Sequence, residues 1–159
     1  MGPVLDSIVV ERQLAAPVGR VWEWWTDEER VRSWFAPAAR VGAEPGEPYE
    51  LFWEPDHPER NSTAGCRVLD SAPTERLAFE WKGPEEHAAV MNLDPPPTAV
   101  LVTFTALDQE LTQVRVEHTG WGEGPEWEAA RTWHVQAWEG VLGQLENQLG
   151  RPGDRPATA

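Results

Sequence analysis

The sequence contains only one cysteine, Cys66, among its 159 residues. A lone cysteine cannot form an internal disulfide, so nothing in the chain indicates an oxidising compartment. Long apolar runs are also missing, and none approaches the ~20 residues of a membrane-spanning helix. The start of the chain has neither the basic nor the apolar segment of a signal peptide. We therefore expect a cytoplasmic protein with no membrane insertion.

Basic residues are scarce as well. The chain has 13 Lys and Arg against 27 Asp and Glu, which gives a formal net charge of −14. Such a surface repels nucleic acid and the anionic face of a membrane. We expect neither as a partner, and we interpret the charge as a solvated surface that keeps the protein soluble.

Recognisable enzyme signatures are absent. The chain has no G-x-S-x-G, no Cys–His signature, no H-E-x-x-H and no phosphate-binding loop. Acidic and imidazole groups do meet in the turn at 55–61, but they match no metal-ligand spacing and are expected at a solvated hairpin tip. The sequence therefore predicts no catalytic residue, no metal and no cofactor, and it points away from an enzyme.

Tryptophan is what the chain has in excess, with ten Trp beside four Phe and one Tyr. Each Trp buries a large area and carries an indole N–H that needs a partner when it is buried. An aromatic interior this bulky does not close neatly around itself. The composition therefore predicts a cavity or groove that accepts an apolar or aromatic guest.

Apolar periodicity predicts a strand, two short helices, a run of strands and one long helix. Residues 8–14 alternate as a strand. A helix opens at Ala16-Pro17 and shows a buried stripe at i, i+3, i+4, i+7, and a second helix is expected over roughly 27–36. Short alternating segments then follow at the ten-residue spacing of antiparallel hairpins, near residues 49–53, 64–70, 77–81, 100–104 and 114–118.

The last predicted element is a helix from about Pro125 to Leu149 with one continuous apolar face. A curved sheet with one apolar face can bury that face only against this helix. The expected fold class is therefore α+β: a curved antiparallel sheet of about six to seven strands wrapped around the long C-terminal helix. We expect a single domain over 1–150 and a disordered tail over 151–159.

Several short motifs occur in an order that is typical of one family. They are Ala16-Pro17, Val21-Trp22, Trp25-Thr26-Asp27, Trp34-Phe35-Ala36-Pro37, Leu77-x-Phe79-x-Trp81, His118-Thr119-Gly120-Trp121-Gly122, Glu126-Trp127 and Ala137-Trp138. Over residues 6 to 150 the chain resembles the START-like helix-grip (SRPBCC) superfamily. Within it, the chain is similar to the family named after the C-terminal domain of heat-shock chaperone ATPase activator homologues.

This resemblance implies a helix-grip fold with a cavity between sheet and helix. It implies no reaction, because the family has no shared catalytic residues, and superfamily relatives range from lipid carriers to polyketide cyclases. Family members that stimulate a chaperone carry a further N-terminal domain, and we expect none in this sequence.

The aromatic residues are the main candidate site. Each of them could simply pack in the core, but rigid aromatic walls are also what an apolar ligand pocket uses. We expect some members of this set to line the cavity: Trp25, Trp34, Trp53, Phe79, Trp81, Phe104 and Trp138.

Four further residues complete the candidate set. His118 shares a strand face with Val114 and Val116, and His134 lies on the inner face of the long helix. Both are expected to face one interior space, either as hydrogen-bonded core residues or as polar anchors for a ligand. Arg12 points inward on the first strand, where an ion pair or a ligand anion would satisfy it.

Residues 84–97 form an insertion between strands that is either a packed surface loop or a lid. Met91, with Val90 and Leu93, is expected on the apolar side of a short helix in this segment, and methionine adapts to varied ligands. Met91 therefore joins the ligand-binding candidates.

The leading hypothesis is non-catalytic binding of a small apolar or aromatic molecule in the cavity. Two alternatives stay open. One is a cyclase- or hydrolase-like enzyme that uses His118 or His134 as acid–base. The other is a chaperone-regulating or other protein-interaction module, which an exposed aromatic patch around Trp24 and Trp121 would favour. A protein partner or a homodimer also stays open.

Overall fold

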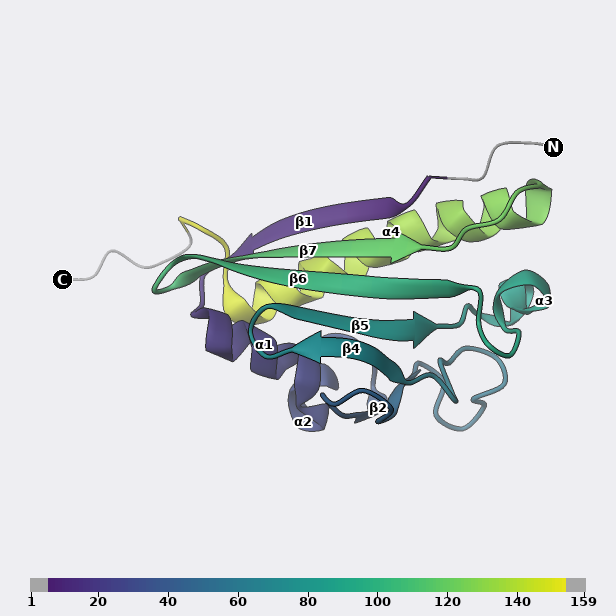
Figure 1. Ribbon diagram of the computed structural model, residues 1–159, viewed down its shortest axis with the longest axis horizontal. Coiled ribbons are helices and arrows are strands. Elements are labelled where there is room, and N and C mark those ends of the chain that lie inside the picture. The colour runs from purple at the N-terminus through teal and green to yellow at the C-terminus, as the bar shows by residue number, and fades with distance from the viewer. Residues whose placement is uncertain (1–5, 154–159) are drawn as a thin grey trace.

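Five antiparallel strands form the main sheet, in the order β1–β7–β6–β5–β4 (Figure 1). The computed structural model describes residues 6–153, so most of the tail expected at 151–159 lies outside the described residues. A separate two-stranded sheet pairs β2 with β3. The strand bounds are β1 Ile8–Leu14, β2 Ala38–Val41, β3 Tyr49–Phe52, β4 Val68–Ala72, β5 Arg76–Trp81, β6 Thr98–Asp108 and β7 Leu111–Thr119.

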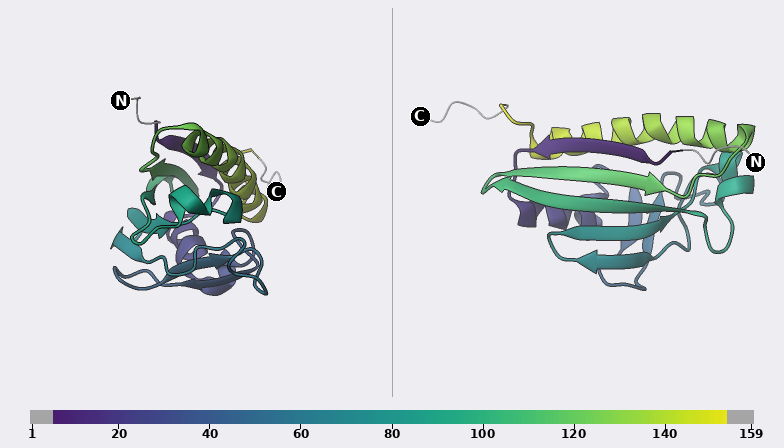
Figure 2. Two further views of the ribbon diagram at one scale, coloured as in Figure 1. Left: turned by 90° about the vertical axis from the view of Figure 1, so that its right-hand side faces the viewer. Right: turned by 45° about the horizontal axis from the view of Figure 1, so that its top comes forward.

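The long helix α4 covers Pro125–Leu149, as the sequence predicts. It begins after Gly124, whose φ of 109° suits glycine, and Pro125 stands where no backbone N–H is needed. Gly150, with a φ of 93°, ends it. The helix runs along one face of the five-stranded sheet (Figure 2), and the α+β helix-grip expectation is confirmed.

Alternation along the strands supplies the inner face of the sheet. In β7, the buried residues Val114, Val116 and His118 alternate with half-buried ones. Val100, Val102 and Phe104 do the same in β6, but its last residues, 105–108, are exposed. The inward residues pack toward α4, whereas the opposite face of the sheet is left uncovered in Figure 1. No helix within residues 6–153 is long and apolar enough to cross a membrane.

Two short helices follow β1: α1 over Val18–Thr26 and α2 over Glu28–Val31. The expectation of a second helix over 27–36 was too long. Asp27 caps α2 by accepting a hydrogen bond from the N–H of Glu29, but the helix stops at Val31 and turns carry the chain on to Phe35. The residue before a proline avoids helical backbone, so Pro37 excludes a helix that reaches residue 36.

The strand predicted at 64–70 was also misplaced, because β4 spans Val68–Ala72. Residues before it form a turn in which Gly65 has a φ of 88°, and the hydroxyl of Thr63 accepts from the N–H of Leu51. The backbone N–H of Tyr49 then donates to the carbonyl of Cys66, which ties the small sheet to the segment that leads into β4. Strand β2 was not predicted, since four residues are too few to show alternation.

The insertion at 84–97 folds into the 3₁₀ turn η1, Glu85–His87, and the short helix α3, Ala88–Met91. Met91 is fully buried. Leu93, which was expected beside it, is instead 52% exposed because α3 ends before it.

Candidate functional site

A pocket of about 200 Å³ lies between α4 and the C-terminal end of β5. Its walls come from α4, from the end of β5 and the residues just after it, and from the segments that follow α2 and β3. The lining residues are mostly aromatic and aliphatic: Phe35, Trp53, Asn61, Trp81, Lys82, Pro84, Trp133, His134, Ala137, Trp138 and Val141.

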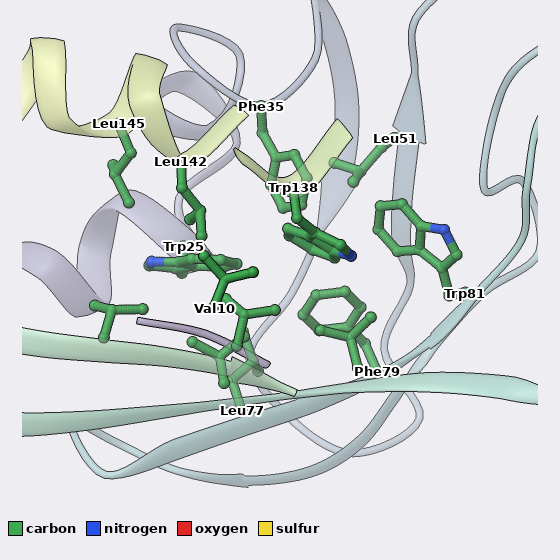
Figure 3. Packing of buried hydrophobic residues seen from close by; sticks show 14 of the residues in the cluster. Val10, Trp25, Phe35, Leu51, Leu77, Phe79, Trp81, Trp138, Leu142 and Leu145 are labelled. Atoms are coloured by element: carbon green, nitrogen blue, oxygen red, sulfur yellow. The ribbon is translucent and has the colours of Figure 1, made fainter. Parts of the chain in front are cut away.

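Hydrogen bonds hold three of the four tryptophan walls in place. The indole N–H of Trp53 donates to the carbonyl of Phe35 at 2.9 Å. Those of Trp81 and Trp138 donate to histidine nitrogens on opposite sides of the interior. The rings of Trp81 and Trp138 are 5.2 Å apart between centroids, and Figure 3 shows Trp138 reaching from α4 toward Phe79 with Phe35 and Trp81 beside it. The pocket walls are therefore fixed by the core.

The two tryptophan–histidine pairs run in opposite directions between sheet and helix. Trp81 on β5 donates to Nε2 of His134 on α4 at 3.0 Å. Trp138 on α4 donates to Nδ1 of His118 on β7 at 3.1 Å. The two imidazole rings are perpendicular to each other, with centroids 5.4 Å apart, so both histidines share one interior space.

Both imidazoles are neutral. An indole can only donate, so the nitrogen that faces each tryptophan carries no proton. The second nitrogen of His134, Nδ1, then donates to the carbonyl of Ala130 at 2.7 Å. The second nitrogen of His118, Nε2, likewise donates to the hydroxyl of Thr98 at 3.0 Å. Neither histidine has a nitrogen left for a ligand or a substrate.

Burial reinforces this neutral state. Desolvation lowers the pKa of His134 to about 4, with the carbonyl of Ala130 opposing the shift and His87 adding to it. The pKa of His118 is held well below its ordinary value, first by burial and then by the nearby His134. At neutral pH the two residues act as acceptors for the tryptophans.

Four of the eleven predicted site residues line the pocket: Trp53, Trp81, His134 and Trp138. Six others lie in the core around it. Phe79 stacks on Tyr49 with centroids 4.0 Å apart. His118 lies behind the two tryptophans. The remaining four are fully or almost fully buried: Trp25, Trp34, Met91 and Phe104.

Arg12 lies away from the pocket. Its guanidinium pairs with Glu139 on α4, and it also reaches Glu146 at 3.3 Å. Of the two partners expected for Arg12, an ion pair or a ligand anion, the structure shows the ion pair, and this pair links β1 to α4.

Seven lining residues were not among the predicted ones. Trp133, Ala137 and Val141 follow one another at i, i+4, i+8 along α4, so this second helical stripe could have revealed them. Phe35, Asn61, Lys82 and Pro84 lie in turns or at a strand end, where no periodicity marks them. Within the described residues, no cluster of three or more His, Cys, Asp or Glu could hold a metal ion.

A curved antiparallel sheet, a long C-terminal helix and an aromatic pocket between them define a helix-grip protein. A family model for Activator of Hsp90 ATPase homolog 1-like protein matches residues 15–150. The chain belongs to this family, which confirms the resemblance seen in its sequence.

Solved structures share the fold at low sequence identity. A protein of Bacillus halodurans is 20% identical with a TM-score of 0.69, covering 93% of this chain and 99% of its own. The Aha1 dimer from Colwellia psychrerythraea is 15% identical with a TM-score of 0.67, at 91% and 96% coverage. An HSP90 activator from Plasmodium falciparum is 13% identical with a TM-score of 0.67, also at 91% and 96%. No curated protein matches the chain.

Proposed function

We propose that the protein binds a small apolar or aromatic molecule, without catalysis, in the pocket between β5 and α4. The observation that supports this best is the set of aromatic rings that surround about 200 Å³ of space. A cavity of about 150 Å³ lined by apolar side chains accepts benzene. A ligand of one or two fused rings therefore suits this volume.

The fixed orientation of the walls favours such binding. The indole N–H groups of three walls, Trp53, Trp81 and Trp138, each donate a hydrogen bond to a partner within the fold. A pocket whose side chains are already ordered loses little conformational entropy when a ligand enters. The rings then offer flat apolar surface rather than polar groups, so shape and apolar area would select the ligand.

The alternative of an enzyme that uses His118 or His134 has little support. Each of the four ring nitrogens already has a partner in the core, whereas a general acid or base must reach the substrate with one of them.

The alternative of a protein-interaction module also lacks its expected surface. Trp121 is only 1% exposed, and Trp24 is half-buried beneath the guanidinium of Arg30. In the described part of the chain, the exposed large apolar residues lie on separate elements and in loops between them. A cytoplasmic location and a homodimer, the state of the Colwellia relative, stay predictions.

Filling the pocket from α4 tests the proposal. Ala137 lines the pocket, so Ala137→Trp should place a ring inside it and abolish binding. Asn147→Trp adds the same ring at an exposed position of the same helix and should leave binding unchanged. The probe is 2-naphthamide, a neutral two-ring compound, titrated by calorimetry and by tryptophan fluorescence. Equal binding by both variants, or none by the unmodified protein across one- and two-ring probes, would contradict the proposal.

A further inference from the structure

Of the four tryptophans that line the pocket, Trp133 is the one whose indole N–H has no hydrogen-bond partner within residues 6–153. We propose that its ring is the entrance of the pocket: it moves outward to admit a ligand and closes again only over a compact molecule of one or two aromatic rings. This inference rests on the proposed function and adds the route of entry and the residue that limits the length of the ligand.

Trp133 lies between the pocket and solvent. Together with Asn61 and Pro84 it lines both the pocket and a more open hollow of about 270 Å³ next to it. The other residues of that hollow are charged and exposed: Glu54, Arg60, Glu85 and Glu86. The apolar pocket therefore meets water at the edge that the three shared residues form.

Trp133 is the member of this edge that can move most easily. Pro84 is buried and has a fixed φ, and the carbonyl of Asn61 accepts from the backbone N–H of Trp53. The side chain of Trp133 is 37% exposed. Its ring makes edge contacts with His134 and His87, at centroid distances of 4.7 and 6.1 Å. Exposed side chains change rotamer within nanoseconds, so this ring can rotate while α4 stays in place.

The other tryptophan walls cannot open at a comparable cost. Trp81 and Trp138 are buried, and each donates to a histidine nitrogen. Rotation of either would leave a buried indole N–H and a buried imidazole nitrogen unsatisfied, which is unfavourable. Rotation of Trp133 breaks no hydrogen bond within the described part of the chain. A ligand therefore enters most easily past Trp133.

The ring also has space outside the pocket. Trp133 lines a third hollow, of about 620 Å³, together with His87 and with Glu128, Ala129 and Thr132 of α4. An outward rotation moves the ring toward this hollow and joins the pocket to the open one beside it. The length of the ligand then decides whether the ring can return.

A compact ligand is favoured because it lets the ring close. A molecule that fits inside the pocket gains an aromatic contact with the returning Trp133, which also recovers its contact with His134. A longer molecule holds the ring outward and loses that contact. One aromatic contact corresponds to about two- to tenfold in affinity.

Two probes of different length test the inference: 2-naphthamide and anthracene-2-carboxamide, which carry the same amide on two and three linear rings. Trp133→Ala should bind 2-naphthamide about two- to tenfold more weakly than the unmodified protein does, and anthracene-2-carboxamide no more weakly. The affinity ratio therefore shifts toward the longer probe. Calorimetry measures the affinities. Stopped-flow fluorescence should show that 2-naphthamide both associates and dissociates faster in this variant.

Two further variants complete the series. Trp133→Phe keeps a smaller ring and should give an intermediate shift, and it carries the test if the alanine variant does not fold. Trp127→Ala is the matched control, because Trp127 is a partly buried tryptophan of the same helix that lines neither the pocket nor the two hollows. It should leave both the affinity ratio and the rate constants unchanged.

The outcomes separate the two proposals. If 2-naphthamide binds but Trp133→Ala leaves the affinity ratio unchanged, or does not speed association, Trp133 is not the entrance and pocket binding stands. Failure of both probes with the unmodified protein and with every variant, in samples whose folding is verified by circular dichroism, would overturn both.

Discussion

The indole N–H of Trp81 donates to Nε2 of His134 across 53 positions of sequence, at 3.0 Å. The pair joins β5 to α4 at the wall of the pocket. Trp138 and His118 make the same contact with the roles exchanged, helix to sheet. The separation between sheet and helix, and with it the width of the pocket, therefore depends on two hydrogen bonds that point in opposite directions.

Replacing either histidine by leucine should lower the free energy of unfolding. His118→Leu leaves the N–H of Trp138 and the hydroxyl of Thr98 without partners, and His134→Leu leaves the N–H of Trp81. An unsatisfied buried polar group costs about 1–3 kcal/mol. Urea unfolding followed by circular dichroism measures this loss.

A double-mutant cycle tests whether the Trp81–His134 contact itself is the cause. Trp81→Phe combined with His134→Leu removes both partners, so the pair should cost less than the sum of the single changes, by about 0.5–3 kcal/mol. Strict additivity would show that the two side chains contribute independently.

Stability should fall in mild acid because His134 is held neutral. Its pKa is about 4 in the folded protein, against 6.5 for an ordinary histidine. Between these values the unfolded chain binds a proton that the folded chain does not, so this contribution is complete above about pH 6.5 and declines as the pH falls toward 4. The loss over that window is on the order of 3 kcal/mol. Unfolding by urea at a series of pH values measures it.

The matched variant is His134→Gln, whose side chain can accept from Trp81 and donate to Ala130 without titrating. Its stability should decline less steeply than that of the unmodified protein between pH 6.5 and 4. Identical slopes, or an imidazole signal of His134 that titrates near 6.5 in an NMR experiment, would contradict the buried neutral state.

Removal of Arg12 should have little effect on the pocket. Its ion pairs with Glu139 and Glu146 are partly exposed, and such pairs contribute about 0–1 kcal/mol. Arg12→Met should therefore change the unfolding free energy by no more than this, with a smaller effect in high salt, and leave the affinity for 2-naphthamide unchanged. A large loss of affinity would place Arg12 in the binding site after all.

The effect of replacing a glycine by alanine on stability should depend on the backbone conformation at that position. Gly140 lies within α4 with open space around it, so Gly140→Ala should stabilise the protein by about 0.5–1 kcal/mol. Gly120 has a φ of 95°, and a side chain there would collide with the carbonyl of Pro97. Gly120→Ala should cost more than about 2 kcal/mol. Thermal unfolding of the two variants compares them directly.

Elements with long periodic patterns were predictable from the sequence. The stripe of α4 and its flanking glycines located the helix from Pro125 to Leu149. Alternation located β5 and β7 to within a few residues. The turn at Thr63 to Cys66 was not predictable, because it depends on a hydrogen bond with Leu51 from another segment.

The site was predictable in part, for a related reason. Strand alternation and the apolar stripe of the helix indicated that His118 and His134 face the interior, but these patterns do not identify their hydrogen-bond partners. Those partners come from other elements, and only the packed fold brings them within hydrogen-bond distance. Asn61 and Lys82 also line the pocket, but they lie in a bend and just after a strand, where no periodicity marks them.

The pairing of β1 with β7 has a consequence for how the chain folds. Ile8 lies opposite His118, and Leu14 opposite Thr112, so among the described residues the first strand pairs only with a strand about a hundred residues later. Arg12 pairs with Glu139 within α4, and the N–H of Ala15 donates to the carbonyl of Gly150 at the end of that helix. Contacts between such distant segments slow folding. During synthesis, β1 leaves the ribosome long before its partner, and the pocket walls can assemble only when almost the whole chain has been made.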